Sequence, residues 1–146
     1  MGIYNNLLVV VDLTPESHFI IARAQALAAD GAALSLMHVV EYMPMEPMGE
    51  TVLPAVQLEG ELVARAKEKL ALLAAEHGLT HSRQIVTMGN IKTEIQSTAQ
   101  QCAADLIVVG NHPRRGLKAL VNFTEDAVLH VSPCDVLAVH LPNRAG

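Results

Sequence analysis

Short apolar runs alternate with helix-like patterns along this chain. Residues 7–11 and 106–109 form runs of Leu, Ile and Val that are too short for helices. Such runs are typical of strands that are buried on both faces of a sheet. The segments between the runs place apolar residues three and four positions apart, as amphipathic helices do. Because strand–crossover–strand units are almost always right-handed with parallel strands, the alternation predicts an α/β fold, a three-layer α/β/α sandwich.

The predicted order is β-α-β-α-β-α-β-α-β, with strands over 7–11, 33–40, 83–88, 106–109 and 135–141. The predicted helices cover about 14–29, 55–77, 91–102 and 123–131. We expect Thr14 to cap the first helix and Gly31 to end it. One buried face is expected along the long second helix, made of Leu58, Leu62, Ala66, Leu70 and Leu73. With no linker or low-complexity tract, residues 1–146 are predicted to form a single domain.

The composition argues against several classes of partner. Ten Lys and Arg stand against 15 Asp and Glu, a net charge of −5, which disfavours nucleic acid and anionic lipid. No stretch approaches the length of a membrane helix, and no targeting segment is visible at the start. Cys102 and Cys134 form no CxxC motif, so we expect buried thiols, no metal site and a cytoplasmic location. Met43, Met45 and Met48 could offer thioethers to Cu(I), but an apolar lid is the commoner use of Met.

The loop after the fourth predicted strand carries the densest group of functional residue types. The sequence from Asp105 to Leu120 reads DLIVVGNHPRRGLKAL, so Gly110 ends a buried strand and cations follow it. The carboxyl ends of parallel strands share one edge of the sheet, and ligands bind there in open α/β folds. Arg114, Arg115 and Lys118 could therefore hold an anion. The alternative is that they are solvated charges that keep this edge soluble.

Catalytic chemistry has little support in the sequence. There is no GxSxG motif, no cluster of metal ligands and no P-loop. Asp12 ends the first predicted strand, where it could contact a ligand or could stabilise the next turn through its side chain. A lone carboxylate does not make an acid–base pair, and His112 has no acid or nucleophile assigned beside it. We therefore expect no enzyme, apart from slow hydrolysis of a bound nucleotide.

Five segments, taken in order, resemble the universal stress protein family. They read LLVVVDLTPES, SLMHVVE, GNIKTEI, DLIVVGNHPRRGLK and SPCDVLAVHLP, and together they span nearly the whole chain. The resemblance implies an adenine nucleotide α-hydrolase-like sheet of five parallel strands in the order 3-2-1-4-5. It also implies a homodimer in which the last strand, from Val136 to Leu141, pairs with its copy. If that strand lies at the edge of the sheet, no Lys or interior Pro protects its open backbone groups.

Members of this family that bind ATP carry the motif G-x2-G-x9-G-S/T, from which this chain departs. Gly110 occupies the first position, but Pro113 stands at the second. Phe123 stands at the third, before Thr124, and a one-residue deletion would put Asn122 and Phe123 there instead. Proline has no N–H to donate to a phosphate and fixes its own φ. The resemblance, whose DLTPES opening is like that of A-type members, thus implies a stress-response binding or signalling module with weak or no ATP binding.

The alternative is a nucleotide sensor that holds ATP or AMP, with Mg²⁺, at the same edge. The resemblance places Asp12 beside the ribose and the Val39 backbone beside the adenine, while Arg114 would hold phosphates. The candidate nucleotide or anion site comprises Asp12, Val39, Gly89, Val109, Gly110, His112, Arg114, Gly116 and Thr124.

Overall fold

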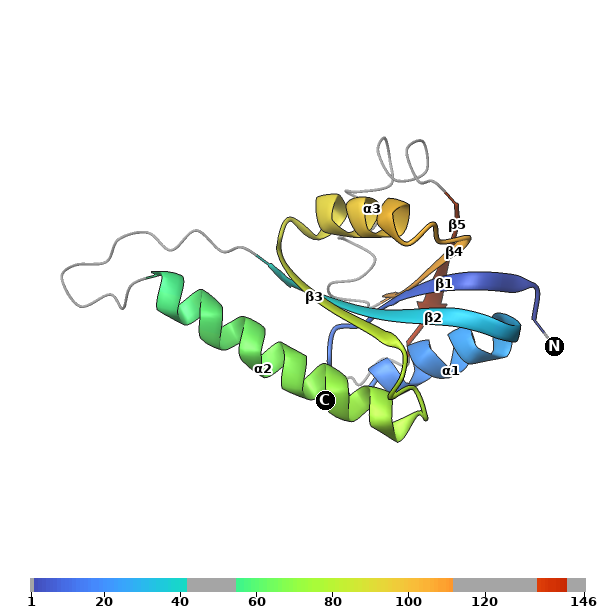
Figure 1. Cartoon of the computed structure of the whole chain (residues 1–146), viewed down its shortest axis with the longest axis horizontal. Coiled ribbons are helices and arrows are strands. Elements are labelled where there is room, and N and C mark those ends of the chain that lie inside the picture. Colours follow the sequence, from blue (N-terminus) through green and yellow to red (C-terminus); the bar gives the residue numbers. More distant parts are fainter. Residues whose placement is uncertain (1, 42–54, 112–133, 142–146) are drawn as a thin grey trace.

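The computed structural model describes residues 2–41, 55–111 and 134–141, which form a five-stranded parallel sheet with helices on both faces (Figure 1). The strands are β1 (Tyr4–Val10), β2 (Ala28–Glu41), β3 (Arg83–Gly89), β4 (Leu106–Asn111) and β5 (Asp135–His140). The helices are α1 (Ser17–Leu27), α2 (Ala55–Glu76) and α3 (Ile91–Gln101). The strand order is β3-β2-β1-β4-β5, and every neighbouring pair is parallel, as predicted. The helix predicted over 123–131 lies outside the described residues.

Two apolar cores lie on the two faces of the sheet. Because side chains alternate along a strand, Leu7 and Val9 of β1 face the core under α1 and α2, and Leu8 and Val10 face the core under α3. Figure 1 shows α1 and α2 together on one side of the sheet and α3 on the other. The central strand is thus buried on both faces, which explains why its sequence is a continuous apolar run rather than an alternating one.

The first helix begins and ends at other residues than predicted. α1 starts at Ser17, after a tight turn in which the Ser17 N–H donates to the Thr14 carbonyl over 2.9 Å. Thr14 is not its cap, because the Thr14 hydroxyl donates to Asp12 instead. The helix ends at Leu27, and Gly31 lies inside β2 with a φ of +76°. The β1–β2 register shifts between Tyr4 and Asn6, so Gly31 belongs to an irregular start of β2 rather than to a helix end.

The long helix α2 buries part of its predicted apolar face. Ala66, Leu70 and Leu73 are buried against the sheet, and Leu58 is half-buried. Leu62 is 43% exposed, so its prediction as a core residue was wrong. Figure 1 shows that the amino-terminal part of α2 extends beyond the ends of the strands.

The described residues also test the predictions about cysteines, membranes and metals. Within the described residues neither Cys102 nor Cys134 forms a disulfide, and both are half-buried rather than buried. Cys102 follows the last turn of α3, where the layer of core side chains ends. In the described parts of the chain, no helix combines the length and hydropathy needed to cross a bilayer. The same residues contain no group of three or more His, Cys, Asp or Glu placed to hold a metal ion, and Met43, Met45 and Met48 lie outside them.

Candidate functional site

Five of the nine predicted site residues lie in the described structure, and all five are at the carboxyl ends of the strands. Val10 pairs with Met37 and Val9 pairs with Val108, so Asp12, Val39 and Gly110 follow at nearly the same level of the sheet. Val109 belongs to the same end of β4. Gly89, at the end of β3, pairs with Glu41 of the neighbouring strand β2. Glu41 lies two positions beyond Val39. The parallel topology therefore brings these residues to one edge, whatever their separation in sequence.

Asp12 organises the turn that leaves β1. Its Oδ1 accepts three hydrogen bonds: from the Thr14 N–H at 3.2 Å, the Thr14 hydroxyl at 2.8 Å and the Ser17 hydroxyl at 3.1 Å. Ser17 is fully buried, so this carboxylate satisfies a hydroxyl that solvent cannot reach. Asp12 itself is exposed, and its Oδ2 makes no hydrogen bond to any residue that the structure describes. The side chain thus stabilises the turn and still presents one oxygen at the edge of the sheet.

Leu13, between Asp12 and Thr14, has a strained backbone. Its φ is +63°, a left-handed conformation that is rare for a residue with a branched apolar side chain. The Leu13 side chain packs against the core under α1 and α2, which holds the residue in place. Strain of this kind persists where the surrounding structure over-determines it, and it is frequent at ligand sites.

Gly110 has a packing role independent of any ligand. A Cβ atom at this position would lie 2.7 Å from Ile20 Cδ1 and 2.9 Å from Leu141 Cδ1, closer than side chains approach one another. The glycine therefore lets β4 pass close to α1. Val109, one residue earlier, is 8% exposed and packs into the core under α3.

Gly89 links β3 to the first turn of α3. Its φ is +149°, and a Cβ there would lie 3.1 Å from the Glu94 carboxylate. Asn90 follows as the helix cap, and its Oδ1 accepts from the Thr93 N–H over 3.2 Å. The amino terminus of α3 therefore begins at the same edge of the sheet as Asp12 and Val39, and helix amino termini favour negative charge.

Thr87 is a candidate that the sequence did not single out. Its Oγ1 is enclosed and has no hydrogen-bond partner among the described residues. Thr87 pairs with Val39, so the orphaned hydroxyl lies beside the strand position expected to face an adenine. A polar residue inside the otherwise apolar run IVTM was the available signal.

His38 fixes the relation between the ends of β1 and β2. Its Nδ1–H donates to the Val11 carbonyl over 2.8 Å, and the Val11 N–H donates to the Met37 carbonyl over 2.9 Å. Both bonds hold the residue before Asp12 against β2. The carboxylate is therefore positioned by backbone contacts on one side and by the Thr14–Ser17 turn on the other.

The remaining predicted site residues, His112, Arg114, Gly116 and Thr124, lie outside the described residues, as do Arg115, Lys118 and Pro113. The two interpretations of the cationic loop, an anion site or solvated charge, both stay predictions. The described residues include Asp12 and Val39 of the candidate site, with Thr87 beside Val39 on the neighbouring strand.

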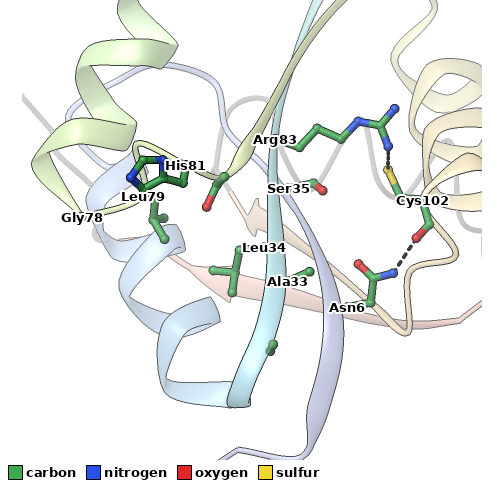
Figure 2. A pocket seen from close by; sticks show the side chains of 11 residues that line it. Asn6, Ala33, Leu34, Ser35, Gly78, Leu79, His81, Arg83 and Cys102 are labelled. Carbon is green, nitrogen blue, oxygen red and sulfur yellow. Dashed lines mark hydrogen bonds between the residues drawn. The ribbon is translucent and has the colours of Figure 1, made fainter.

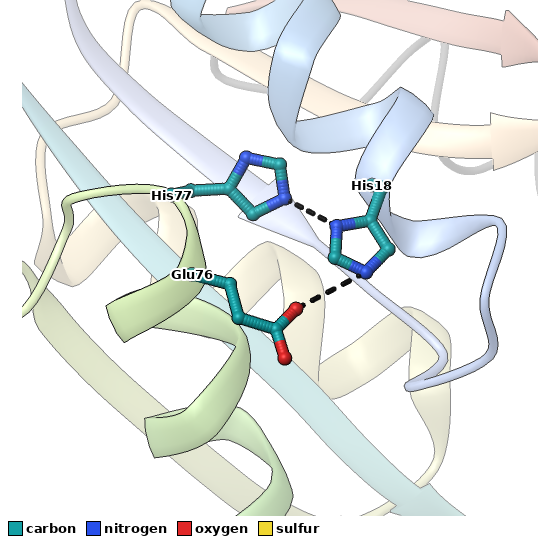
Figure 3. A network of polar contacts seen from close by, with 3 residues as sticks. All are labelled: His18, Glu76 and His77. Atoms are coloured by element: carbon teal, nitrogen blue, oxygen red, sulfur yellow. Dashed lines mark hydrogen bonds and ion pairs between the residues drawn. The ribbon is translucent and has the colours of Figure 1, made fainter.

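A second polar cluster, also missed from the sequence, joins α1 to the end of α2 (Figure 3). His18 Nδ1 and His77 Nε2 lie 2.6 Å apart, and His18 Nε2 lies 3.2 Å from Glu76 Oε2. One histidine nitrogen must donate and the other accept, so the contact requires a neutral imidazole on at least one side. Partial burial, with the neighbouring His18 as a smaller cause, lowers the pKa of His77.

Comparison with known proteins gives consistent matches over nearly the whole chain. The model of the universal stress protein family matches residues 3–140. Universal stress protein A homolog 1 of Coxiella burnetii is 37% identical over 138 residues, which cover 93% of this chain and 96% of that protein.

Solved structures show the same fold at lower sequence identity. The structure of hypothetical protein MJ0577 superposes with a TM-score of 0.71 at 19% identity and covers 96% of this chain and 98% of its own. A universal stress protein in complex with cAMP superposes with a TM-score of 0.60 at 23% identity and covers 95% of this chain and 99% of its own.

Proposed function

Because the chain belongs to the universal stress protein family, we propose that it acts as a cytoplasmic, homodimeric stress-response binding or signalling module that holds adenine nucleotide weakly or not at all. The observation that carries the proposal is the set of polar atoms at the carboxyl ends of β1 and β3. Asp12 presents one carboxylate oxygen there, and Thr87 has an enclosed hydroxyl without a partner among the described residues. The Asp12 oxygen suits the hydroxyls of a nucleoside, while the enclosed Thr87 hydroxyl lies beside Val39, the position expected to face the ring.

Weak binding of the phosphates follows from the sequence of the next loop. Pro113 stands where nucleotide binders have a glycine, so one backbone N–H is missing from the expected phosphate cradle. The bulk of Phe123 near the end of the motif adds a second obstacle. Arg114 and Arg115 would compensate in part, because guanidinium groups pair well with phosphate oxygens.

The alternative is a nucleotide sensor that binds ATP or AMP, with Mg²⁺, through Asp12, Val39, Gly110, Arg114 and Thr124. The solved universal stress protein in complex with cAMP makes adenine nucleotides the class to test first. Mass spectrometry of protein purified without added nucleotide distinguishes the sensor from the weak-binding module. We expect apo protein, and co-purified ATP or AMP would favour the sensor.

Calorimetric titration with MgATP measures the affinity directly. We expect a dissociation constant above about 100 µM, because a cradle that lacks backbone donors loses several hydrogen bonds to phosphate. Arg114→Ala and Arg115→Ala should weaken whatever binding is seen, and Arg23→Ala, which removes an exposed arginine of α1, serves as the control. Low-micromolar affinity would contradict the weak-binding proposal. Equal affinity in all three variants would contradict the placement of the phosphates.

We infer no robust catalysis at this edge. Asp12 uses Oδ1 to hold its own turn, and no second acid or base among the described residues is hydrogen-bonded to it. Slow hydrolysis of a bound nucleotide is the most we expect. Multiple turnovers that disappear in Asp12→Asn or His112→Ala at unchanged binding would establish an enzyme instead.

The homodimer is proposed to form through β5. This strand lies at the edge of the sheet beside β4, and Ala138 on it is exposed. An edge strand without lysine offers open backbone groups to a second copy, and a two-fold contact closes the assembly.

A lysine on this edge should prevent the pairing. We expect Ala138→Lys to be monomeric in light scattering coupled to size exclusion, because two copies of the charge would meet across the two-fold axis. Ala71→Lys adds the same charge to the exposed face of α2 and should stay dimeric. A dimeric Ala138→Lys variant would place the interface elsewhere.

A further inference from the structure

A cavity of about 410 Å³ lies at the amino-terminal edge of the sheet, opposite the candidate nucleotide site (Figure 2). Its walls come from the starts of β1, β2 and β3, the turn between α2 and β3, and the residue after α3. Its volume falls in the range of small-molecule sites, roughly 300–1,000 Å³. The lining residues, all described, are Asn6, Ala32, Ala33, Leu34, Ser35, Gly78, Leu79, His81, Ser82, Arg83 and Cys102.

Ser35 is the first sign that this cavity receives a polar ligand. The residue is 6% exposed and lines the cavity, and its hydroxyl makes no hydrogen bond to any described residue. The hydroxyl oxygen is not enclosed by protein, so it is open to a molecule held in the cavity. Figure 2 shows Ser35 on β2 between Arg83 and Asn6.

The charge of the lining favours an anion. None of the lining residues is acidic, although the chain as a whole carries a net charge of −5. The Arg83 guanidinium donates one hydrogen bond, over 3.6 Å, to the soft acceptor Cys102 Sγ, and it forms no ion pair with a described carboxylate. Its other N–H groups are therefore available to a carboxylate or phosphate, which a guanidinium binds through paired donors.

The carboxyl termini of α2 and α3 lie at this edge, but they do not cancel the preference of the cavity for an anion. Carbonyl groups at a helix carboxyl terminus carry partial negative charge and would repel an anion. Asn6 satisfies this terminus of α3, because its Nδ2 donates to the carbonyls of Cys102 and Ala103. The end of α2 is closed by backbone bonds, with the Leu79 N–H donating to the Ala74 carbonyl over 2.8 Å.

The remaining wall is apolar. Leu34 and Leu79 lie on the side nearer α2 (Figure 2), and both pack, with Ala32, against the core under α1 and α2. A ligand that fits both walls has one negatively charged group and a compact hydrocarbon body. We propose that this cavity binds a small organic anion, a carboxylate or phosphate with an apolar group, through Arg83 and the Ser35 hydroxyl.

Cys102 gives the experiment a built-in reporter. It lines the cavity, whereas Cys134, which is also half-buried and forms no disulfide within the described residues, does not. The rate of alkylation by iodoacetamide is measured at both thiols by mass spectrometry, with increasing phenyl phosphate or benzoate. We expect either anion to slow alkylation of Cys102 severalfold and to leave Cys134 unchanged, while neutral benzyl alcohol at equal concentration protects neither thiol.

Variants assign the effect to the proposed groups. Arg83→Gln should raise the concentration needed for half-protection at least about tenfold, as expected for a lost charge-assisted hydrogen bond. Arg23→Gln removes an equal charge from the exposed face of α1 and should leave protection intact. Ser35→Ala is a second, milder variant that should weaken protection about threefold or more, should Arg83→Gln fold poorly. Because each rate is compared with and without anion in the same variant, direct effects on the thiol cancel.

The proposal is overturned if neither anion protects Cys102, or if protection is the same in Arg83→Gln, Ser35→Ala and the unaltered protein. Protection by phenyl phosphate but not benzoate identifies a phosphate ligand, and the reverse pattern identifies a carboxylate. This outcome is independent of MgATP titration, since the two sites lie at opposite edges of the sheet.

Discussion

Gly110 and Gly60 differ in the space that surrounding atoms leave for a side chain. At Gly110 a Cβ would collide with Ile20 and Leu141, whereas at Gly60, inside α2, a Cβ would meet no atom within 4 Å. Gly110→Ala should therefore destabilise the protein by about 1–3 kcal/mol through overpacking. Gly60→Ala should stabilise it by about 0.5–1 kcal/mol, because alanine is the better helix former. Urea denaturation of both variants checks the pair, and a Gly110→Ala variant as stable as Gly60→Ala would contradict this packing.

Asp12 is expected to matter for stability as well as for binding. Asp12→Ala leaves the buried Ser17 hydroxyl without its acceptor, at a cost of about 1–3 kcal/mol. Asp12→Asn keeps an oxygen at the Oδ1 position, so this variant should lose less stability than Asp12→Ala. Asp30→Ala, at an exposed carboxylate, is the control for the change in charge. If Asp12→Ala and Asp30→Ala unfold at the same urea concentration, the turn does not depend on this carboxylate.

The helix pair α1–α2 should be sensitive to acid. Because the pKa of His77 is lowered in the folded protein, the unfolded chain takes up a proton first as the pH falls below about 6.5. The contribution of His77 is complete above that pH and is lost as the pH drops through the lowered value. His18 and Glu76 face this imidazole, and protonation of both histidines would break their 2.6 Å contact.

The test compares urea midpoints between pH 7.5 and pH 5. We expect the unaltered protein to lose more stability over this range than His77→Gln does, while His81→Gln, at an exposed histidine, behaves like the unaltered protein. Parallel curves for all three proteins would show that the His18–His77 contact has no role in acid sensitivity.

The elements differ in how far the sequence could predict them. The strands and their parallel pairing follow from alternating apolar runs and the crossover rule, whereas the strand order was implied only by the resemblance to the universal stress protein family. The start of α1 was mispredicted because the Thr14 hydroxyl bonds to Asp12, a competing local hydrogen bond. The exposure of Leu62 depends on which elements pack against α2, and periodicity along a helix carries no such information.

At the scale of the whole molecule, the candidate nucleotide edge was predictable and the opposite cavity was not. Parallel topology alone brings Asp12, Val39 and Gly110 to one edge. Ser35, Arg83 and Cys102 come from three elements and form no motif, and the His18–His77 contact joins positions 59 apart in sequence. Such juxtapositions arise from tertiary packing, so residue spacing does not reveal them.

We propose that this universal stress protein binds nucleotide at the carboxyl edge of its sheet, and that it binds weakly. The most direct measurement is a titration of isotope-labelled protein with MgATP followed by amide chemical shifts. We expect chemical-shift changes centred on Asp12, Val39 and Val109, with half-saturation above about 100 µM. Saturation at low-micromolar nucleotide, or shifts confined to Asn6, Ser35 and Arg83 at the other edge, would contradict it.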